Sequence, residues 1–238
     1  MPLGRFLEIS IYSPELLESL GFYERLGLTQ AVAGDIWKHG YGVVSDGTVA
    51  VGLHAYEFAS PALVWVRPRL AEFARQLEAR DIPPEFIKTG EDQFNELGFL
   101  DPDGQMITLL EARTFSPPST PPPPPAAGFF REYRYPVRRL DEAVAFWESM
   151  GFVATDVSEG PGASAALTSD GIDLCVYESS RREPPVLVFA SADLARTGEL
   201  LSERDLAPAS GEDAVSEGPC LTLRAPEGTS ICILCEPI

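Results

Sequence analysis

Glu8 and Glu132 are the two residues whose type and spacing most directly suggest chemistry. They stand 124 positions apart, and the chain repeats itself at that offset. A carboxylate at matching places in two diverged copies is a candidate for a shared site, because it can transfer a proton or anchor a cationic or hydrogen-bonding ligand. The sequence therefore predicts one polar anchor in each half of the chain.

The repeat extends along most of the chain. Matching strings include Ser45-Asp46-Gly47 with Ser169-Asp170-Gly171, and Pro102-x-Gly104-x-x-Ile107 with Pro226-x-Gly228-x-x-Ile231. Such self-similarity indicates a tandem duplication. A run ending in five consecutive prolines separates the copies, and Pro-rich runs form extended, semi-rigid spacers. We therefore expect a first module over residues 1–112, a linker over 113–127 and a second module over 128–238.

The composition limits the classes of partner. With 36 Asp and Glu against 18 Lys and Arg, the net charge is −18, which repels nucleic acid and anionic membranes and favours cationic ligands at encounter. No apolar run is long enough to span a membrane, and the N-terminus lacks a secretion signal. All four cysteines lie in the second half, so they form no disulfide framework common to both copies. We expect a cytoplasmic monomer or homodimer whose partner is a small molecule.

Both halves show the same order of strands and helices. Residues 6–12 alternate as a strand, Ser13-Pro14 is typical of a helix start, and Gly27 ends the helical spacing of apolar residues. Further helices are predicted over residues 70–77, 140–150 and 194–201, with β-rich segments around the Asp-Gly turns between them. The fold class is α+β, with a sheet in each half and helices behind it.

These elements resemble the vicinal oxygen chelate superfamily, which includes glyoxalase I, extradiol ring-cleaving dioxygenases and bleomycin-resistance proteins. The resemblance rests on Phe22-Tyr23-x-x-Leu26-Gly27-Leu28 and Asp101-Pro-Asp-Gly104-x-x-Ile107. The second half matches through Phe146-Trp147-x-x-Met150-Gly151-Phe152 and Ala225-Pro-Glu-Gly228-x-x-Ile231. The resemblance covers nearly the whole chain outside the linker. It implies two tandem βαβββ modules whose curled mixed sheets enclose a cleft, with helices packed outside.

The resemblance also implies where a divalent metal would bind. In the metal enzymes of this family, ligands lie on the first strand, at the start of the strand before the second helix, and just after the Ile of the Gly-x-x-Ile string. These places are held by Glu8, Ala62 and Thr108 in the first half and by Glu132, Val186 and Cys232 in the second. A catalytic metal needs about three protein ligands. The sequence therefore predicts that the family metal site is lost and that no cofactor is bound.

Strand alternation assigns neighbours to the two carboxylates. An apolar face of Leu7, Ile9 and Ile11 turns Phe6, Glu8, Ser10 and Tyr12 toward the cleft, and the matching face carries Phe130, Glu132 and Arg134. The candidate catalytic residues are Glu8 and Glu132, and the candidate ligand-binding residues are Tyr12, Trp37, His39, Thr108, Arg134 and Cys232. A carboxylate on such a wall acts as an anchor or base, unless a nearby arginine makes it a structural ion pair. His54 carries no signal beyond its residue type.

Three functions are compatible with these features. The first is a metal-free binding protein, similar to the bleomycin-resistance branch, that holds a small aromatic or cationic compound in a cleft. The second is a glyoxalase-like lyase or dioxygenase-like enzyme that uses a cleft glutamate for proton transfer. The third is an interaction protein whose clefts are vestigial, for which filled clefts and a large exposed apolar patch would be the sign.

Overall fold

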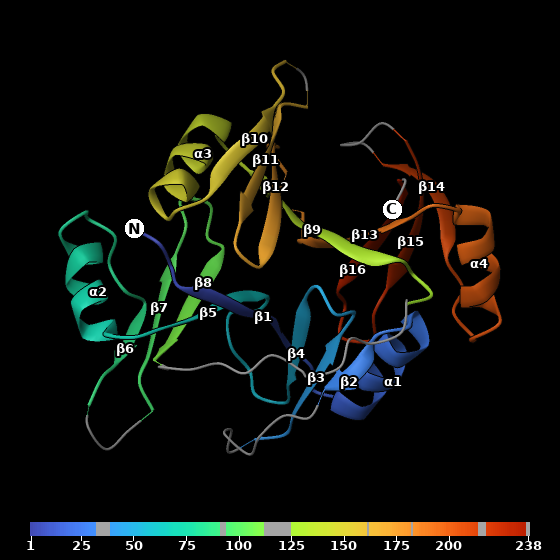
Figure 1. Cartoon of the computed structure of the whole chain (residues 1–238), viewed down its shortest axis with the longest axis horizontal. Helices are drawn as coiled ribbons and strands as arrows, with labels where there is room; N and C mark the ends of the chain where they lie inside the picture. The colour runs from blue at the N-terminus through green and yellow to red at the C-terminus, as the bar shows by residue number, and fades with distance from the viewer. Residues whose placement is uncertain are drawn as a thin grey trace.

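The computed structural model describes residues 1–31, 39–90, 94–111, 125–160, 162–181, 183–213 and 218–236. Two sheets are visible in Figure 1, each accompanied by two helices. The first half contains β1 (Arg5–Tyr12), α1 (Leu16–Leu26), β2 (Thr29–Ala31), β3 (Tyr41–Ser45), β4 (Ala50–His54), β5 (Ala62–Arg67), α2 (Leu70–Glu78), β6 (Phe86–Lys88), β7 (Glu96–Leu100) and β8 (Met106–Glu111). None of the helices in the described part of the chain is both long and apolar enough to cross a membrane.

The second half repeats this order of elements. It contains β9 (Phe129–Val137), α3 (Leu140–Ser149), β10 (Val153–Val157), β11 (Ser164–Ser169), β12 (Ile172–Glu178), β13 (Val186–Ser191), α4 (Leu194–Ser202), β14 (Ala209–Asp213), β15 (Gly218–Arg224) and β16 (Ser230–Cys235). The α+β class and the tandem organisation are confirmed. The structure adds that the order βαβββ occurs twice within each half, because the repeat found in the sequence is itself a pair of such units.

Each half forms one mixed sheet of eight strands. The orders are β2-β3-β4-β1-β5-β8-β7-β6 and β10-β11-β12-β9-β13-β16-β15-β14. Each half contains two βαβββ units, and the first strands of these units pair antiparallel at the centre of the sheet. They are β1 and β5 in the first half and β9 and β13 in the second. On either side they pair parallel with the last strand of their own unit, as β1 does with β4. Side chains of β1, β4, β5 and β8 that point the same way therefore share one face of the first sheet.

Helix α1 begins and ends near the residues that the sequence indicated, but with different capping. It starts at Leu16, and the Ser13 hydroxyl donates to Ser19 Oγ at 2.9 Å instead of capping the first turn. Gly27 ends it with a positive φ of 104°. A Cβ atom there would lie 2.2 Å from the backbone nitrogen of Ala126. Glycine is thus required both by the backbone conformation and by the close approach of another segment.

The centre of β1 contains an irregularity that changes which residues face the core. The register with β5 shifts between Phe6 and Glu8, which pair with Trp65 and Val64. Leu7 is the extra residue, as in a β-bulge. Phe6 therefore lies in the main core, with its ring 5.1 Å from that of Trp65, and not on the face of Glu8 as strict alternation predicted.

The same irregularity occurs in β9. Phe130 pairs with Phe189 and Glu132 with Val188, which leaves Arg131 as the extra residue. Phe130 packs against the main core, with its ring 5.8 Å from that of Phe189. The prediction that Phe130 shares a face with Glu132 and Arg134 was wrong for the same reason. Arg131 is exposed, which explains why a charged residue is tolerated there.

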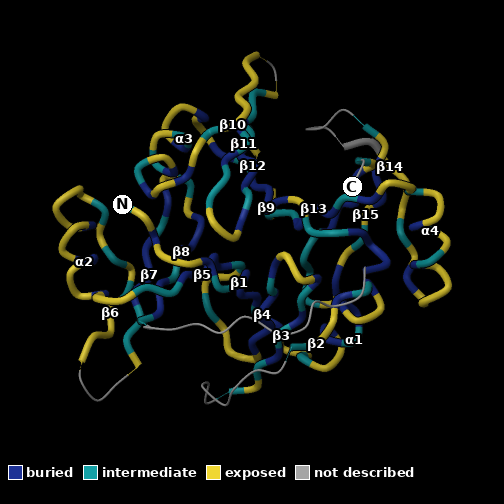
Figure 2. Tube along the Cα trace, viewed as in Figure 1, coloured by how far each residue is buried: buried dark blue, intermediate teal, exposed yellow. Residues whose placement is uncertain are grey.

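One hydrophobic core spans both halves. It includes Trp65 from β5 and Trp147 from α3, whose rings lie 6.3 Å apart. Figure 2 shows the buried segments following the strands of both sheets, with exposed residues on the outer helices and on the tip of the β10–β11 hairpin. Buried apolar area is the main source of stability in a domain, so the two halves stabilise each other.

The end of the predicted linker belongs to this core. Residues 113–124 lie outside the described residues, but Ala126 and Ala127 are buried, and the Ala127 amide donates to the Leu26 carbonyl at 3.1 Å. The last residues of the expected spacer, Ala126 and Ala127, therefore pack into this core. Alanine side chains are small enough to pack against the C-terminus of α1, which prolines alone did not indicate.

Candidate functional site

Glu8 lies at the centre of a buried polar cluster on the inner face of the first sheet. Its side chain is carried by β1 beside β4, where Ser10 pairs with Gly52 and Tyr12 with His54. Glu8 is only 2% exposed. A Cβ atom on Gly52 would lie 2.3 Å from Glu8 Oε1, so the missing side chain at residue 52 provides the space for this carboxylate.

Both oxygens of the Glu8 carboxylate have partners. Ser10 Oγ donates to Oε1 at 2.6 Å, and His54 Nε2 lies 3.2 Å from the same oxygen. The Tyr41 hydroxyl donates to Oε2. Three partners around one carboxyl group suit the ionised form, which only accepts hydrogen bonds. Hydrogen bonds from neutral or titratable side chains thus compensate for the burial of the Glu8 carboxylate.

The cluster continues outward through a second imidazole. His54 Nδ1 lies 3.0 Å from Nε2 of His39, so the two histidines and Glu8 form a chain of hydrogen bonds. His54 is 5% exposed, whereas His39 is partly exposed. Loss of hydration lowers the pKa of His39, and the neighbouring His54 adds to the effect. His39 is therefore predominantly neutral at pH 7.

Aromatic rings surround the two histidines. The Tyr41 ring lies 4.5 Å from that of His54, and Phe58 meets His54 edge-on at 5.5 Å. Tyr56 stacks on His39 with the ring centroids 5.4 Å apart and an interplanar angle of 28°, and Tyr56 is 60% exposed. The first-half site is thus filled by its own side chains around Glu8 and reaches solvent at His39 and Tyr56.

Glu132 occupies the equivalent place in the second half with a different partner. Arg134 donates to Glu132 Oε1 from Nε at 3.0 Å and from its terminal nitrogen at 2.7 Å. The two residues are 7% and 4% exposed. Beside β9, the places that Gly52 and His54 hold beside β1 are taken by Cys175 and Tyr177, and Ser164 pairs with Tyr177 as Tyr41 pairs with His54. This carboxylate is neutralised by a permanent charge, as a structural ion pair.

The positions at which the resemblance implies metal ligands lie in a row across each sheet, and each row contains too few ligands. Across the sheet, Glu8 pairs with Val64, which pairs with Thr108; Glu132 pairs with Val188, which pairs with Cys232. Ala62 and Val186 lie one step along the same faces and add no donor. Within the described residues, no three His, Cys, Asp or Glu side chains form a metal-binding group. Glu8 and His39 bond to opposite nitrogens of His54, so these three do not converge on one ion. Within the described residues, these positions therefore do not supply the set of about three ligands that a catalytic metal needs.

The structure brings together only some of the predicted site residues. Glu8 and His39 are joined through His54, Glu132 is joined to Arg134, and Thr108 and Cys232 lie on the rows of the two glutamates. Cys232 is buried against Val188 and Cys220. Tyr12 ends β1, where its amide donates to Ser60 Oγ at 2.9 Å. Trp37 lies outside the described residues.

Sequence reasoning missed Tyr41 and His54. One signal was available for His54: it follows Gly52 by two residues on a strand, so both point the same way, and a glycine in a strand often marks a close approach. The partner strand of β4 was not known from the sequence. Tyr41 gave no comparable signal, because nothing local places its hydroxyl above a carboxylate from β1.

A cavity lies elsewhere, between the two halves. It measures about 1030 Å³ and is open to solvent. Apolar side chains form much of its wall, among them Pro61, Met106, Pro136, Pro184 and Pro185. Polar groups at its rim include Arg138, Ser179, Arg181 and Glu183. Neither Glu8 nor Glu132 lines it, so this cavity and the polar cluster around Glu8 are separate.

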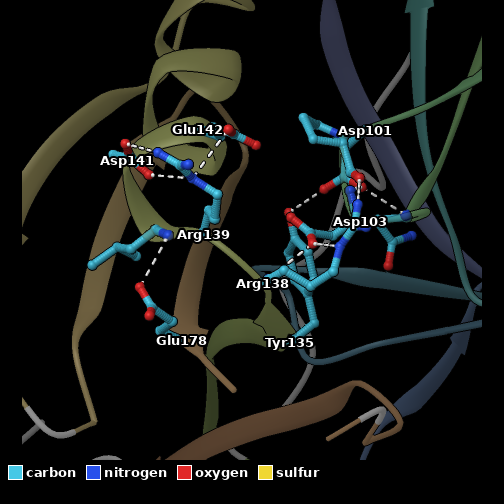
Figure 3. Close-up of polar contacts among 11 residues, drawn as sticks. Asp101, Asp103, Tyr135, Arg138, Arg139, Asp141, Glu142 and Glu178 are labelled. Carbon is cyan, nitrogen blue, oxygen red and sulfur yellow. Dashed lines mark hydrogen bonds and ion pairs between the residues drawn. The ribbon is translucent and has the colours of Figure 1, made fainter. Parts of the chain in front are cut away.

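A network of hydrogen bonds connects several residues that line this cavity. The Tyr135 hydroxyl donates to Asp101 Oδ2 at 2.8 Å, and Arg138 Nε donates to Asp103 at 3.1 Å (Figure 3). Trp147 Nε1 donates to the Tyr135 hydroxyl at 2.5 Å. Burial raises the pKa of Asp101, against the opposing effect of its hydrogen bonds. Burial and the charge of Asp101 raise the pKa of Tyr135 well above its ordinary value. These groups tie the Asp-Pro-Asp-Gly turn of the first half to β9 and α3 of the second.

The chain was compared with known proteins at the levels of sequence and structure. No family model and no curated protein matches it. Among solved structures it is similar to a catechol 2,3-dioxygenase, with a TM-score of 0.67 and 14% identity over 98% of this chain and 88% of that one. It is also similar to the 2,3-dioxygenase LapB from Pseudomonas sp. KL28, with a TM-score of 0.66 and 16% identity over 97% and 91%. A third is 2,2',3-trihydroxybiphenyl 1,2-dioxygenase from Sphingomonas wittichii strain RW1, with a TM-score of 0.62 and 14% identity over 97% and 90%. The chain therefore shares the fold of these dioxygenases, as the sequence predicted, and at such identities the likeness concerns the fold alone.

Proposed function

We propose that this chain, which has the fold of the extradiol dioxygenases, is a metal-free protein that binds a small planar, aromatic compound in the cavity between its halves. The observation that carries the proposal is the cavity itself. Its volume of about 1030 Å³ matches the roughly 300–1,000 Å³ of small-molecule sites, and such sites combine apolar walls with a few polar groups.

The chemistry of the cavity wall supports a planar ligand. Five of its lining residues, Pro61, Pro102, Pro136, Pro184 and Pro185, are prolines. Proline rings present flat, rigid surfaces and lose no side-chain freedom when a ligand covers them. Tyr135 adds an aromatic ring whose hydroxyl is already engaged with Asp101. An aromatic ring packed between such surfaces gains apolar burial at little entropic cost.

The rim supports a ligand with polar substituents. Arg138 is held by Asp103, and the Tyr177 hydroxyl donates to Glu183 at 2.9 Å. Arg181 and Ser179 lie beside them on the β12–β13 connection. Both signs of charge therefore border the cavity, so the overall net charge of −18 sets the rate of encounter more than the local preference for a cation.

The metal-free part of the proposal is supported by the donor set of each half. A dioxygenase-like or lyase-like reaction through a divalent ion would need about three ligands. The row of Glu8 adds valine and threonine, and the row of Glu132 adds valine and a cysteine beside a glutamate already paired with Arg134. The vestigial interaction protein is less supported, because the large exposed apolar residues are scattered over α1, β6, β10 and loops.

A thermal-shift screen of the full chain tests the proposal. The panel comprises neutral, anionic and cationic derivatives of naphthalene, together with zinc, iron(II) and manganese ions with and without chelator. A ligand that binds the folded state raises Tm. We expect stabilisation by naphthalene derivatives, lost in Ala59→Trp, which places a large ring at the exposed mouth of the cavity. The control Ala71→Trp puts the same ring on the exposed face of α2 and should leave the shift intact.

Two results would contradict the proposal. Stabilisation by a metal ion that chelator reverses would show that a metal site is present. Stabilisation by aromatic compounds that persists unchanged in Ala59→Trp would place the ligand outside this cavity. The charge of the best derivative decides between the aromatic and the cationic alternatives, because only the charged substituent differs within the panel.

A further inference from the structure

We propose that the cavity between the halves selects aromatic carboxylates, with Arg138 as the residue that binds the carboxylate group. This rests on the proposed function, because it names the chemical class of the compound that occupies the same cavity. Two acidic side chains at the cavity already accept hydrogen bonds from the protein, whereas a guanidinium beside them keeps unused donors. A planar carboxylate is the chemical complement of such a guanidinium.

Arg138 is held at the rim by two bonds to the first half of the chain. It directly follows β9 and lines the cavity. Its Nε donates to Asp103 Oδ1 at 3.1 Å (Figure 3), and its Nη2 donates to the Pro102 carbonyl at 2.5 Å. Both N–H groups of Nη1 and one of Nη2 are left without an acceptor in the part of the chain that the structure describes. The guanidinium is thus oriented by the protein and still has donors for a ligand.

The acceptors around this guanidinium are already engaged. Asp103 Oδ1 also accepts from the backbone amide of Arg138 at 2.9 Å. Asp101 Oδ1 accepts from the amides of Asp103 and Gln105 at 2.9 and 2.8 Å, and its Oδ2 accepts from the Tyr135 hydroxyl. A ligand group that donates would compete with these bonds, whereas a ligand group that accepts finds free donors. The polar contacts therefore favour an acceptor on the ligand.

A second cavity adjoins the first at Arg138. It measures about 530 Å³, and the two cavities share Arg138, Ser179 and Ser180 as lining residues. Ser179 Oγ accepts from the Arg181 amide at 3.1 Å, so its own proton is available to a ligand. The junction of the cavities thus offers one positive charge and two hydroxyl groups. We expect the carboxylate to lie there, bonded by both oxygens to the guanidinium, with the aromatic ring against the prolines of the first cavity.

Acidic residues on either side limit where an anion can bind. Glu183 keeps its charge beside a neutral partner, because burial and Glu183 itself raise the pKa of Tyr177. Glu183 lines only the first cavity and Glu178 only the second, so the junction between them is where a positive charge is available. The other acids that make up the net charge of −18 act weakly beyond the Debye length of about 8 Å at physiological salt. They slow the encounter with an anion more than they change its affinity.

Isothermal titration calorimetry of the full chain with 2-naphthoate and 2-naphthamide tests this assignment. The two compounds have the same rings and nearly the same shape, but only naphthoate is charged. We expect naphthoate to bind about tenfold more tightly at neutral pH and physiological salt, the ratio that one charge-assisted hydrogen bond can supply. Arg138→Gln should abolish this preference. Arg138→Lys should keep part of it, because an ammonium retains the charge but not the planar pair of donors.

The adjacent arginine provides a matched control. Arg139 binds Asp141 and Glu142 (Figure 3) and lines neither cavity. Arg139→Gln removes the same charge one residue away and should leave the ratio of the two affinities unchanged. Damage to the fold would weaken both compounds alike, so the ratio reports the contact with the carboxylate and not the stability of the protein.

The outcomes separate this inference from the proposed function. Equal binding of the two compounds to the unaltered protein, or a ratio unchanged in Arg138→Gln, would overturn the carboxylate assignment. An equal fall of the ratio in Arg139→Gln would also overturn it, because the preference would then depend on net charge. If both compounds bind equally and Ala59→Trp abolishes both, the cavity is still the binding site and only its selectivity was wrong. If neither compound binds, both proposals fail.

Discussion

Glu8 and Glu132 occupy the same place in the two halves, yet they are buried by different means. Glu8 is held by a serine, a tyrosine and a histidine, and the histidine continues to a second one near the surface. Glu132 is held by one arginine. Arginine stays charged at all accessible pH values, whereas histidine titrates near neutrality. A buried carboxylate paired with arginine stabilises one state, and one paired with histidines can exchange protons.

The largest expected effect comes from removing the arginine. Arg134→Met leaves Glu132 buried without its cation, which should lower the free energy of unfolding by about 3–5 kcal/mol. Urea denaturation measures the loss. The double variant Glu132→Leu/Arg134→Met should recover most of it, because no charge is then buried. If the double variant is as unstable as the single one, the pair serves packing and not charge compensation.

The next effect concerns the space that Gly52 leaves for Glu8. In Gly52→Ala the new methyl group would lie 2.3 Å from the carboxylate, and relieving such overpacking should cost about 1–3 kcal/mol. The same substitution in a Glu8→Ala background should cost much less, because the clashing group is gone. Thermal denaturation of the four proteins gives this cycle. Additive losses would contradict the close contact.

One substitution made in both halves compares the two carboxylates directly. Glu8→Gln keeps an acceptor oxygen for neutral donors and should cost about 1 kcal/mol. Glu132→Gln leaves Arg134 charged and only 4% exposed, so its cost should approach that of Arg134→Met. Denaturant midpoints at pH 7.5 provide the measurement. Equal losses of unfolding free energy in Glu8→Gln and Glu132→Gln would mean that the histidines near Glu8 carry a positive charge comparable with that of Arg134.

The smallest effect is a dependence of stability on pH that belongs to the first half. The pKa of His39 is lower in the folded protein than its ordinary value, so the unfolded state binds more protons between the two values. Stability should therefore fall as pH drops below about 6.5, and the full loss should be present below the folded pKa. Denaturation between pH 5 and 8 should show a weaker fall in His39→Gln. Burial raises the pKa of Asp101, which has the opposite effect in acid, so the difference between variants isolates His39.

The fold was largely predictable from local signals, whereas the site was only partly so. The Gly27 helix end, the helical spacing of Leu70 and its neighbours and the 124-residue repeat all depend on residues close in sequence or on their recurrence. They gave the tandem α+β architecture. The second βαβββ unit within the first half went unrecognised, since its strand β6 has only three residues.

The partner of each carboxylate depended on strand order. Arg134 was found because it lies two residues from Glu132 on one strand. His54 lies 46 residues from Glu8, and only the parallel pairing of β1 with β4 brings them together. The bulge at Leu7 was equally hidden, because alternation assumes an unbroken pleat. The cavity arises where the two halves meet, and neither copy indicates it alone.

The bulges in β1 and β9 carry a record of how the protein arose. Leu7 and Arg131 are the extra residues at equivalent positions, although one is aliphatic and the other charged. Duplication copies the backbone irregularities already present, so we infer that the bulge was part of the ancestral half before it was doubled. The histidines of one half and the arginine of the other are not shared, and they mark divergence after that event. The bulges therefore predate the duplication, and the different partners of Glu8 and Glu132 arose after it.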